Sequence, residues 1–490
     1  MSPGPFHWTD TTVRRALGLE EVDGSGEISF NRISTDTRTL SEGDLFIALE
    51  GPNYDGHDFL SEAAVQGARA AVVSRPASGQ EVLPLYPVPD TLVALGQLAR
   101  FRRRSLAGTV IALTGSSGKT TVKDLLQAIL GAQARVHATS ANLNNRVGVP
   151  LTLLDTPDDA EFVVVELGTN QSGEIATLTR ITEPDLALVT TVGEGHLEGL
   201  ESLDGVLREK LALLVHLRPG APAFVGDTPI ELPQVARTLR EDVQVVGFTH
   251  AADPRWRGHL GEPDERGRIS FQFRDHSIHP GLPGHHGAQN CLLALSLGDA
   301  LGLSMEEMVP AVEGAAPGRL RGEWLELGSL ALILDCYNAN PQSIRSALSV
   351  LRETRWDGPK IAVLGSMLEL GDHAGRLHQE LLTEAVEGGL DLLLAIGLFQ
   401  DAAQALGWSE EGEEGPRAES GQVRVLTAAD AEEGWERLAP HLTGSELILL
   451  KGSRGVRLEE MVPHFRQSYP AQPDGSTEPG QGSAGTGQED

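Results

Sequence analysis

The sequence is poor in cysteine and has no long hydrophobic run. Its 490 residues include two cysteines, Cys291 and Cys336, and neither stands in a Cys-x-x-Cys pair. Two separate cysteines exclude a disulfide framework and a four-cysteine zinc site. No uninterrupted apolar run approaches the length of a membrane span, and residues 1–15 lack the apolar core of a signal peptide. We therefore expect a cytoplasmic protein with no membrane partner.

Positive charge is also scarce. The chain has 39 lysine and arginine residues against 69 aspartate and glutamate residues, a formal net charge of −30 at pH 7. Proteins that bind nucleic acids or anionic membranes need a basic surface that contacts phosphate groups. The composition therefore argues against both partners, and an anionic ligand would need a local pocket.

The length predicts several domains, because 490 residues exceed what one hydrophobic core usually accommodates. Apolar strand-like runs alternate with helical patterns, which is typical of α/β domains with parallel sheets. We expect a small N-terminal α/β domain, a central P-loop ATPase-like domain and a C-terminal Rossmann-like domain, followed by a disordered tail with little to bury. The expected limits are 1–105, 106–320, 321–467 and 468–490, with a hinge at Ala107-Gly108.

Residues 109–121 give the clearest chemical signal. The apolar run 109–114 ends in Gly115-Ser116-Ser117-Gly118-Lys119-Thr120-Thr121, and apolar residues then recur at helical spacing. In such a strand, loop and helix, backbone amides at the helix N-terminus bind phosphates, Lys119 adds positive charge, and Thr120 can reach a phosphate-bound Mg²⁺. The stretch predicts a nucleoside triphosphate site. A turn that only joins strand to helix is disfavoured, because the lysine and threonines have no packing reason to follow the glycines.

Two polar residues follow the next predicted strands of the central domain. Glu166 comes directly after the run 162–165, and His196 lies in a glycine-rich loop after the run 186–189. Because ligands of parallel sheets lie beyond the carboxyl ends of the strands, Glu166 could complete a Mg²⁺ shell with Thr120. The alternatives remain open here: Glu166 as an ordinary loop or N-cap residue, and His196 as a solvated loop residue rather than a metal ligand.

Lys210 falls inside an apolar stripe at helical spacing. The stripe consists of Leu203, Val206, Leu207, Leu211 and Leu214. A lysine there either extends from the edge of the stripe to solvent or is buried, and burial requires that it be paired, neutralised or modified. In the second case Lys210 could carry CO₂ as a carbamate, an anion that would bind a second Mg²⁺ together with His196.

Outside the central domain the signals are weaker. In the N-terminal part, Arg38 could hold a phosphate or carboxylate, but a surface pair with Asp36 is an equal alternative. In the C-terminal part, polar side chains follow three predicted strands, in the stretches 335–341, 365–371 and 451–454. Such clustering is what a ligand site on a parallel sheet requires, although polar loops are common at strand ends.

The short loop, with Glu166, His196, Lys210, the segment 284–290 and Arg319, resembles the Mur ligases of peptidoglycan synthesis. The resemblance covers nearly all of the chain up to residue 467, and this family uses the short form of the loop, with two residues between the glycines. It implies an ATP-dependent amide ligase that works through an acyl phosphate. The stretches 142–150, 335–341 and 363–371 resemble the branch that adds D-alanyl-D-alanine to UDP-N-acetylmuramoyl-tripeptide, and the Asp-Asn-Pro-Arg motif of the diaminopimelate-adding branch is absent.

The resemblance also implies roles for individual residues. It implies catalytic roles for Lys119, His196, Lys210 and Arg319, and ATP binding by Gly115, Ser116, Ser117, Gly118, Lys119, Thr120, Thr121, Asn290, Arg319 and Asp335. It implies substrate binding by Ser34, Asp36, Arg38, Asn144, Asn145, Tyr337, Asn338 and Asn340. Two Mg²⁺ ions are implied, one held by Thr120 and Glu166, the other by His196 and carbamylated Lys210. The chain departs from the family pattern at Ala212, Gly287 and Ser366, where glutamate, asparagine and aspartate are usual.

Three other functions remain as alternatives. The first is a neighbouring ligase of the same fold that adds the third amino acid of the peptide. The second is an ATP-gated binding module without catalysis, which predicts loss of the metal-binding residues. The third is a simple P-loop kinase or GTPase, which the absence of an Asn-Lys-x-Asp motif and the extra N-terminal domain disfavour. A monomer is expected.

Overall fold

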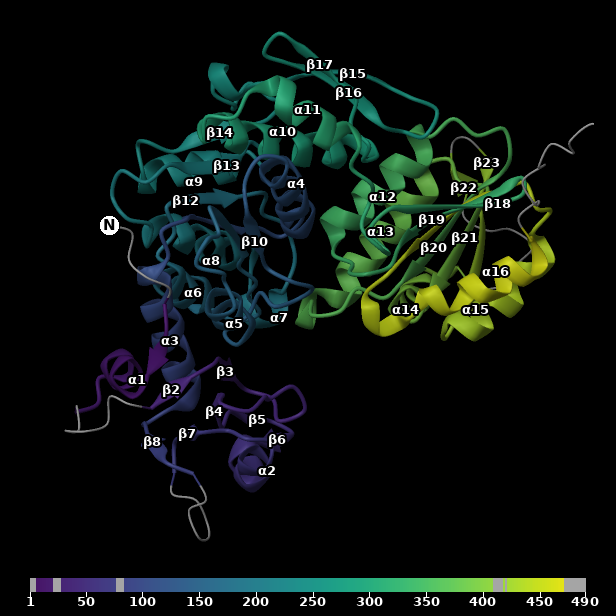
Figure 1. Ribbon diagram of the computed structural model, residues 1–490. Helices are drawn as coiled ribbons and strands as arrows, with labels where there is room; N and C mark the ends of the chain where they lie inside the picture. The colour runs from purple at the N-terminus through teal and green to yellow at the C-terminus, as the bar shows by residue number, and fades with distance from the viewer. Residues whose placement is uncertain (1–5, 21–27, 76–82, 409–416, 419–420, 471–490) are drawn as a thin grey trace, which may run out of the picture.

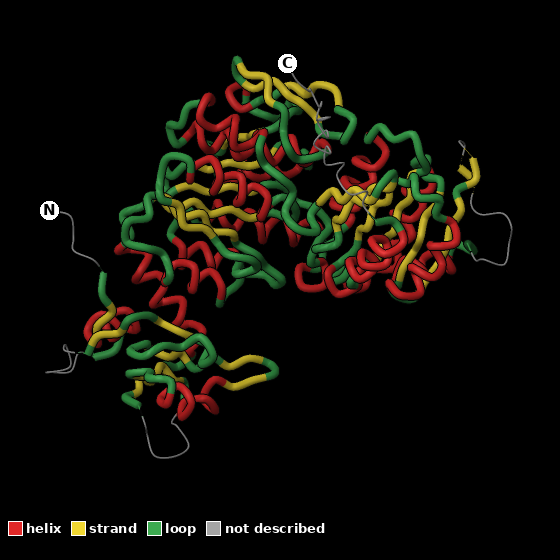
Figure 2. The backbone as a smooth tube through the Cα atoms, turned by 45° about the vertical axis from the view of Figure 1, so that its right-hand side comes forward, coloured by secondary structure: helices red, strands yellow, loops and turns green. Residues whose placement is uncertain are grey.

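The computed structural model describes residues 6–20, 28–75, 83–408, 417–418 and 421–470. The chain forms three α/β bodies: the N-terminal one lies below the central one, and the C-terminal one stands beside the central one (Figures 1 and 2). The expected disordered tail begins at residue 468, and its part from residue 471 onward lies outside the described residues. Within the described ranges, no helix has both the length and the apolar character that crossing a bilayer demands.

The N-terminal body is built on a four-stranded parallel sheet in the order β3-β4-β7-β8. Helix α3 follows this sheet, and Asp90 caps it through the amides of Leu92 and Val93. The elements are β1 (Trp8–Thr9), α1 (Asp10–Leu17), β2 (Ser29–Phe30), β3 (Ile33–Ser34), β4 (Leu45–Ile47), β5 (Glu50–Gly51), β6 (Tyr54–Asp55), η2 (Gly56–Phe59), α2 (Leu60–Val65), β7 (Ala70–Val73), β8 (Leu85–Pro87) and α3 (Thr91–Ser105).

Helix α3 is bonded to the central body by its basic end. The buried Arg103 donates from Nε to the carbonyl of Thr182 at 2.9 Å and forms a 2.7 Å ion pair with Asp185. The link that follows α3 is closely packed, because a Cβ on Gly108 would stand 2.2 Å from the carbonyl oxygen of Ala160. Whether residues 107–108 act as a hinge stays a prediction.

The central body contains a six-stranded, all-parallel sheet in the order β10-β11-β9-β12-β13-β14. Strand β9 is apolar on both faces, and its residues 110–113 have no exposed surface, as expected for a strand covered by helices on both sides. The sheet elements are β9 (Thr109–Thr114), β10 (Val136–Ala138), β11 (Phe162–Glu166), β12 (Leu186–Val189), β13 (Ala223–Gly226) and β14 (Gln244–Val246). The order matters for the site, because β9 lies between β11 and β12.

Helices and one small sheet complete the central body. Helix α10 packs on α4, the helix that follows the glycine loop (Figure 1). Leu203, expected in the buried stripe of α8, is 43 % exposed, since it occupies the first position of that helix. The elements are α4 (Lys119–Gly131), α5 (Gly148–Leu154), α6 (Glu174–Thr182), α7 (Leu197–Leu200), α8 (Leu203–Val215), α9 (Glu231–Leu239), η3 (Pro254–Trp256), β15 (His259–Pro263), β16 (Ile269–Phe273), β17 (His276–Ile278), α10 (Gly284–Ala300) and α11 (Met305–Glu313).

The C-terminal body has a second six-stranded sheet, in the order β18-β19-β25-β20-β21-β24, in which only the edge strand β18 is antiparallel. The three strands that were predicted to precede the polar stretches of this part are present as β19, β20 and β25. The elements are β18 (Glu323–Leu327), β19 (Leu330–Asp335), α12 (Pro341–Glu353), β20 (Lys360–Gly365), η4 (Gly371–His373), α13 (Ala374–Glu387), β21 (Leu392–Ile396), α14 (Leu398–Ala405), β22 (Arg417–Ala418), β23 (Gly421–Gln422), β24 (Arg424–Ala428), α15 (Ala431–Leu438), η5 (Ala439–His441), β25 (Leu447–Lys451), η6 (Arg454–Val456), η7 (Leu458–Met461) and α16 (Val462–Ser468).

The carboxyl ends of the two six-stranded sheets meet. Asn340, which follows β19 and caps α12, donates from Nδ2 to the carbonyl of Ser116 at 3.4 Å, in the glycine loop after β9. Gln342 donates from Nε2 to Oγ1 of Thr191 at 2.9 Å, in the loop after β12. Because polar residues gather at these strand ends, the two bodies bring their ligand-binding edges to one place.

The bonds of α3 give a first prediction. Replacing Arg103 with methionine leaves the carbonyl of Thr182 and the carboxylate of Asp185 without this buried partner. We expect the free energy of the first unfolding transition in urea to fall by about 2–4 kcal/mol. The matched control is Arg104→Met, which removes a 2.6 Å pair with Glu183 at the surface and should cost less than about 1 kcal/mol. Equal effects of the two variants would contradict this account.

Candidate nucleotide and metal site

The glycine loop after β9 has the backbone that its sequence predicts. Gly115 and Gly118 adopt φ values of 152° and 83°, which only glycine adopts readily, and α4 begins directly after Gly118. There is also no room for side chains, because a Cβ on Gly115 would stand 2.0 Å from Oγ1 of Thr190, and one on Gly118 2.4 Å from Oδ1 of Asn290. The amides at the start of α4 are thereby free to bind an anion.

Lys119 extends along this loop. Its Nζ donates to the carbonyl of Gly115 at 2.8 Å. Burial lowers the pKa of Lys119, and the nearby Arg321 lowers it further, while Glu166 acts in the opposite direction. A partly buried cation beside backbone amides is an electrostatic site for phosphoryl oxygens.

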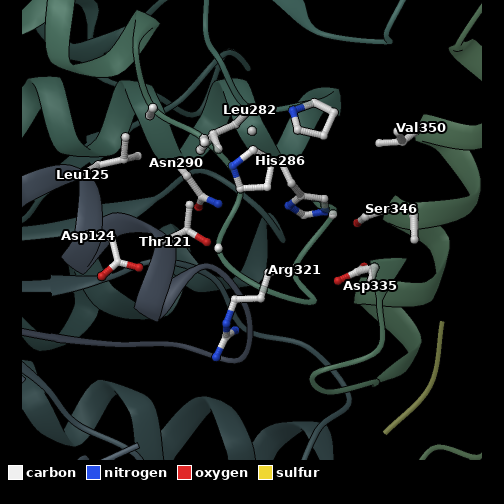
Figure 3. A pocket seen from close by; sticks show the side chains of 18 of the residues that line it. Thr121, Asp124, Leu125, Leu282, His286, Asn290, Arg321, Asp335, Ser346 and Val350 are labelled. Carbon is white, nitrogen blue, oxygen red and sulfur yellow. The ribbon is translucent and has the colours of Figure 1, made fainter. Parts of the chain in front are cut away.

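Two adjoining cavities open on this loop. The first, of about 330 Å³, lies between α4 and α12, with Thr121 and Leu125 on one side, Val350 on the other, and Asn290 on α10 at the back (Figure 3). The second, of about 320 Å³, extends from the glycine loop to the strand ends of both sheets. Both cavities share His286, Asn290, Arg321 and Asp335 in their walls. Together they form one elongated site, mainly apolar at one end and polar at the other.

Glu166 is the last residue of β11 and is 2 % exposed. Its Oε1 accepts a hydrogen bond from Nδ2 of Asn144 at 2.8 Å, while its Oε2 is buried without a partner among the described residues. The reading of Glu166 as an ordinary loop or N-cap residue is therefore wrong. A buried carboxylate oxygen with no donor is suited to a cation, and Thr120 lines the same cavity.

His196 also lines the second cavity and begins helix α7. Its Nδ1 lies 2.6 Å from Oε2 of Glu369, which follows β20 in the C-terminal body. The separation is that of an ion pair, although the ring nitrogen lacks the alignment of a regular hydrogen bond. This contact holds the pKa of Glu369 below its ordinary value. The side chain of His196 is 20 % exposed, so the reading as a solvated loop residue is wrong.

Lys210 is completely buried in α8, and its Nζ has no hydrogen-bond partner among the described residues. The reading of a lysine that reaches solvent is therefore wrong. Burial, and then repulsion from Lys119, lowers the pKa of Lys210 well below its ordinary value, against the pull of Glu209 and Glu166. The adjacent Glu209 is engaged elsewhere, since its carboxylate accepts from the amides of Gly173 and Ile175 at 2.7 Å each. Burial and the charge of Lys119 therefore both disfavour the protonated form of Lys210.

The C-terminal body contributes an ion pair between the buried Lys451 and the partly buried Asp335. Asp335 and Lys451 are paired residues at the ends of β19 and β25, and Oδ2 of Asp335 lies 2.9 Å from Nζ of Lys451. Lys451 also donates to the carbonyl of Asn338 at 2.8 Å. Burial raises the pKa of Asp335, and Lys451 opposes that rise. Lys451 therefore fixes both the side chain of Asp335 and the following loop.

The arginine at the cavities is Arg321 rather than the expected Arg319. Arg321 lines both cavities and points into the first one (Figure 3), and its guanidinium carbon stands 3.9 Å from the ring centre of Tyr337. Arg319 is exposed and is absent from both walls. Sequence reasoning chose between two arginines in one short stretch, and only the turn at Leu320, with φ of 58°, determines which side chain turns inward.

Of the five predicted substrate residues outside the N-terminal body, Tyr337, Asn338 and Asn340 line the second cavity. Asn144 lines it too but is bonded to Glu166. Asn145 lies outside both cavities, where its Oδ1 accepts from the amide of Gly148 at 2.9 Å and so helps to start α5. The roles of these residues in substrate binding stay predictions.

The predicted residues of the N-terminal body lie apart from both cavities. Nη2 of Arg38 contacts Oδ2 of Asp36 at 2.6 Å, and the hydroxyl of Ser34 donates to the carbonyl of Asp36 at 3.1 Å. The bond to Arg38 lowers the pKa of Asp36. The surface pair is thus the observed arrangement, and whether Arg38 also binds a ligand stays untested.

One acidic cluster in the N-terminal body resembles a cation site but is already neutralised. Glu50, Asp55 and His57 bring ligand atoms close together. Arg75 bonds to both carboxylates, and Nε2 of His57 accepts from the amide of Ser74 at 3.0 Å. An arginine in contact with both acids takes the place that a cation would need.

Four residues of the site escaped sequence reasoning. Lys451 and Glu369 lie in the predicted polar stretches and His286 lies in the segment 284–290, but only the fold brings these residues and Arg321 to the site. The glycine at position 287, where the family usually has asparagine, has a local explanation. A Cβ there would stand 2.7 Å from the carbonyl oxygen of Leu282.

Profiles of known protein families match a large part of each of the three bodies. Residues 29–103 match the profile "Mur ligase family, catalytic domain", residues 113–298 match "Mur ligase middle domain", and residues 320–454 match "Mur ligase, glutamate ligase domain". The three matches follow the three bodies of the fold in order.

Individual relatives match over nearly their full lengths. The UDP-N-acetylmuramoyl-tripeptide--D-alanyl-D-alanine ligase of Bacillus subtilis is 32 % identical over 439 residues, which cover 89 % of this chain and 93 % of that protein. A crystal structure of MurF from Acinetobacter baumannii has a TM-score of 0.80 at 30 % identity and covers 95 % of this chain and 100 % of that one. MurF from Thermotoga maritima, solved in complex with ADP, has a TM-score of 0.76 at 26 % identity and covers 89 % and 97 %.

The two arginines before β18 provide a matched test of the cavity assignment. We expect Arg321→Ala to weaken binding of a fluorescent nucleoside triphosphate by about 10- to 100-fold, because it removes a cation from the wall shared by both cavities. Arg319→Ala removes the same charge two residues away, at an exposed position, and should change the affinity by less than about twofold. A larger loss of affinity in Arg319→Ala than in Arg321→Ala would show that Arg319 is the arginine that binds the nucleotide.

Proposed function

This chain belongs to the Mur ligase family, and from that premise we propose that it joins D-alanyl-D-alanine to UDP-N-acetylmuramoyl-tripeptide at the expense of ATP. The product would be the UDP-linked pentapeptide precursor of peptidoglycan. The near full-length similarity to ligases of that name supports this choice within the family.

The observation that carries the proposal is that the two large bodies share one site. The glycine loop, Glu166 and His196 of the central body line the same cavity as Asp335 and Lys451 of the C-terminal body. A ligase needs such a site, because a phosphoryl donor and an amine must meet at one carboxyl group while water is kept away. A kinase or GTPase has no need of the second body.

The reaction has two steps. A terminal carboxylate oxygen of the tripeptide attacks the γ-phosphorus of ATP, the bond to the β–γ bridging oxygen breaks, and an acyl phosphate and ADP form. The amine of D-alanyl-D-alanine then attacks the acyl carbon, and inorganic phosphate leaves with that carboxylate oxygen. The loop amides and Lys119 stabilise the negative charge on the phosphoryl group, and no protein nucleophile is required.

The remaining residues hold the reactants. Asn290 lies beside the glycine loop at the end of the first cavity and is placed to contact the base of ATP. Asp335, held by Lys451, and Arg321 stand where the two cavities join and would contact the ribose and phosphates. We retain the role assigned to Arg319 as an untested alternative.

The oxygen donors fit Mg²⁺. Glu166 offers a buried, unpartnered oxygen and Thr120 a hydroxyl in the same cavity, and hard oxygen ligands are those that Mg²⁺ prefers. Bound there, Mg²⁺ would neutralise charge on the phosphoryl oxygens. We propose Glu166 and Thr120 for one ion, and His196 with Lys210 for a second.

Lys210 fits the proposed carbamate. Only a neutral amine adds to CO₂, and burial lowers the pKa of Lys210 in the direction that favours this form. The product would replace a buried amine that has no partner with an anion in the field of Lys119. Because Glu166 also lies within electrostatic range, the anion would need a cation beside it, which agrees with the second Mg²⁺.

We further propose that the three bodies divide the substrates. The N-terminal body, with Ser34, Asp36 and Arg38, would bind the UDP end of the tripeptide, and the limits at 105 and 320 would separate the working units. Helix α3 ends the N-terminal unit at residue 105, and the bonds of Arg103 hold this unit against the central body.

Phosphate release tests the proposed reaction. With ATP, Mg²⁺ and UDP-N-acetylmuramoyl-tripeptide present, we expect release that depends on D-alanyl-D-alanine, and a UDP-pentapeptide by mass spectrometry. The controls are D-alanine alone, L-alanyl-L-alanine and single amino acids as acceptors. Release with a single amino acid would instead indicate the neighbouring ligase, and no release with any acceptor would indicate a binding module.

Lys210 gives a separate test of the carbamate. We expect Lys210→Ala to lower kcat by at least 100-fold, because the variant loses the ligand for the second ion. A short-chain carboxylic acid such as propionate should restore part of the activity by occupying the space of the carbamate. The matched control is Glu209→Gln with the same acid, which should show no rescue, since Glu209 bonds to backbone amides of the α6 start. Unchanged activity of Lys210→Ala would overturn the assignment.

A further inference from the structure

His196 and Glu369 form a direct contact between the central and C-terminal bodies. Nδ1 of His196 and Oε2 of Glu369 are 2.6 Å apart. The backbones meet as well, because the amide of Glu198 donates to the carbonyl of Glu369 at 3.1 Å, and Nε2 of His373 lies 3.1 Å from the carbonyl oxygen of Glu201. The loop after β20 is thus fixed on the loop after β12.

Both partners of this contact have an unfavourable backbone. His196 adopts a φ of 57° and Glu369 a φ of 64°, values in the left-handed region that residues other than glycine seldom adopt. Such conformations are strained and persist where the surroundings require them, often at functional sites. In this contact, the side chains of His196 and Glu369 face each other.

A carboxylate on one imidazole nitrogen has a defined chemical effect. It fixes the orientation of the ring and keeps the proton on the contacted nitrogen, Nδ1. The other nitrogen, Nε2, is then left as the acceptor. It is also more basic, which strengthens its binding to a cation.

We propose that Glu369 is a positioning residue that prepares His196 to bind a divalent cation, and that the C-terminal body delivers it. The proposal rests on the proposed function only in that His196 is taken as a ligand of the second ion. The sequence alone does not indicate that Glu369 contacts His196, because the two residues are about 170 positions apart and belong to different domains.

The delivery by a separate domain has a thermodynamic consequence. His196 has its carboxylate partner only while the two bodies are together, so closure of the domains strengthens cation binding. Because such coupling is reciprocal, the cation must favour closure by the same factor. The cation site would therefore become complete only after the C-terminal body has closed on the central body, and this order limits premature hydrolysis of the acyl phosphate.

Binding of Mn²⁺ tests the proposal without turnover. The probe is Mn²⁺ followed by electron paramagnetic resonance, with a non-hydrolysable ATP analogue present and a titration without protein subtracted. We expect Glu369→Gln, which keeps the shape but removes the charge, to weaken Mn²⁺ binding by about 10- to 100-fold. The matched control is Asp372→Asn, which removes the same charge three residues away at an exposed position and should change the affinity by less than twofold.

A second pair of variants tests whether Glu369 acts through His196. In a His196→Ala background, we expect Glu369→Gln to cause no further loss of Mn²⁺ affinity beyond about twofold. Wild-type affinity in Glu369→Gln, or an equal loss with and without His196, would overturn the proposal. Because no tripeptide or acceptor is added, failure of the ligase assay would overturn the proposed function and leave this result standing.

Discussion

The site depends on holding two lysines, one buried and one partly buried, beside a phosphate-binding loop in a strongly acidic protein. Lys210 has no exposed surface, Lys119 is partly buried in the glycine loop, and the charge of Lys119 lowers the pKa of Lys210. A cation at that depth is costly unless an anion balances it. Phosphoryl oxygens would supply that balance at Lys119, and a carbamate would remove the need for it at Lys210. The loop geometry, the flanking acids and the closure of the C-terminal body all serve this one local charge balance.

Strand order explains why the site lies where it does. The glycine loop follows the middle strand β9, and Glu166 and His196 follow its two neighbours, β11 and β12. In the C-terminal body, β25 is flanked in the same way by β19 and β20, whose ends supply Asp335 and the loop that contains Glu369. Each sheet therefore contributes three adjacent strand ends. Neither sheet alone encloses the site, because residues from both edges line the same cavity.

The sequence predicted the strands and the glycine loop well, because apolar β-branched runs and glycine spacing are local signals. It also predicted that Lys210 falls in an apolar stripe, although periodicity alone left open whether the lysine is buried. Arg321 and Glu369 could not be predicted, because a positive φ at Leu320 and the approach of a distant domain select them. Asn145 and Arg38 failed to join the cavities for the opposite reason, since each has a nearby partner that satisfies its side chain.

The central claim is that the tripeptide carboxylate is activated as an acyl phosphate at the site shared by the two bodies. The most direct measurement uses UDP-tripeptide labelled with ¹⁸O in its terminal carboxylate, with ATP and D-alanyl-D-alanine, and locates the label by mass spectrometry. The account predicts that one ¹⁸O atom per turnover appears in inorganic phosphate and that the new amide carbonyl keeps the other. Phosphate without ¹⁸O, alongside a labelled pentapeptide, would contradict it, because the carboxylate oxygen would then never have been bonded to phosphorus.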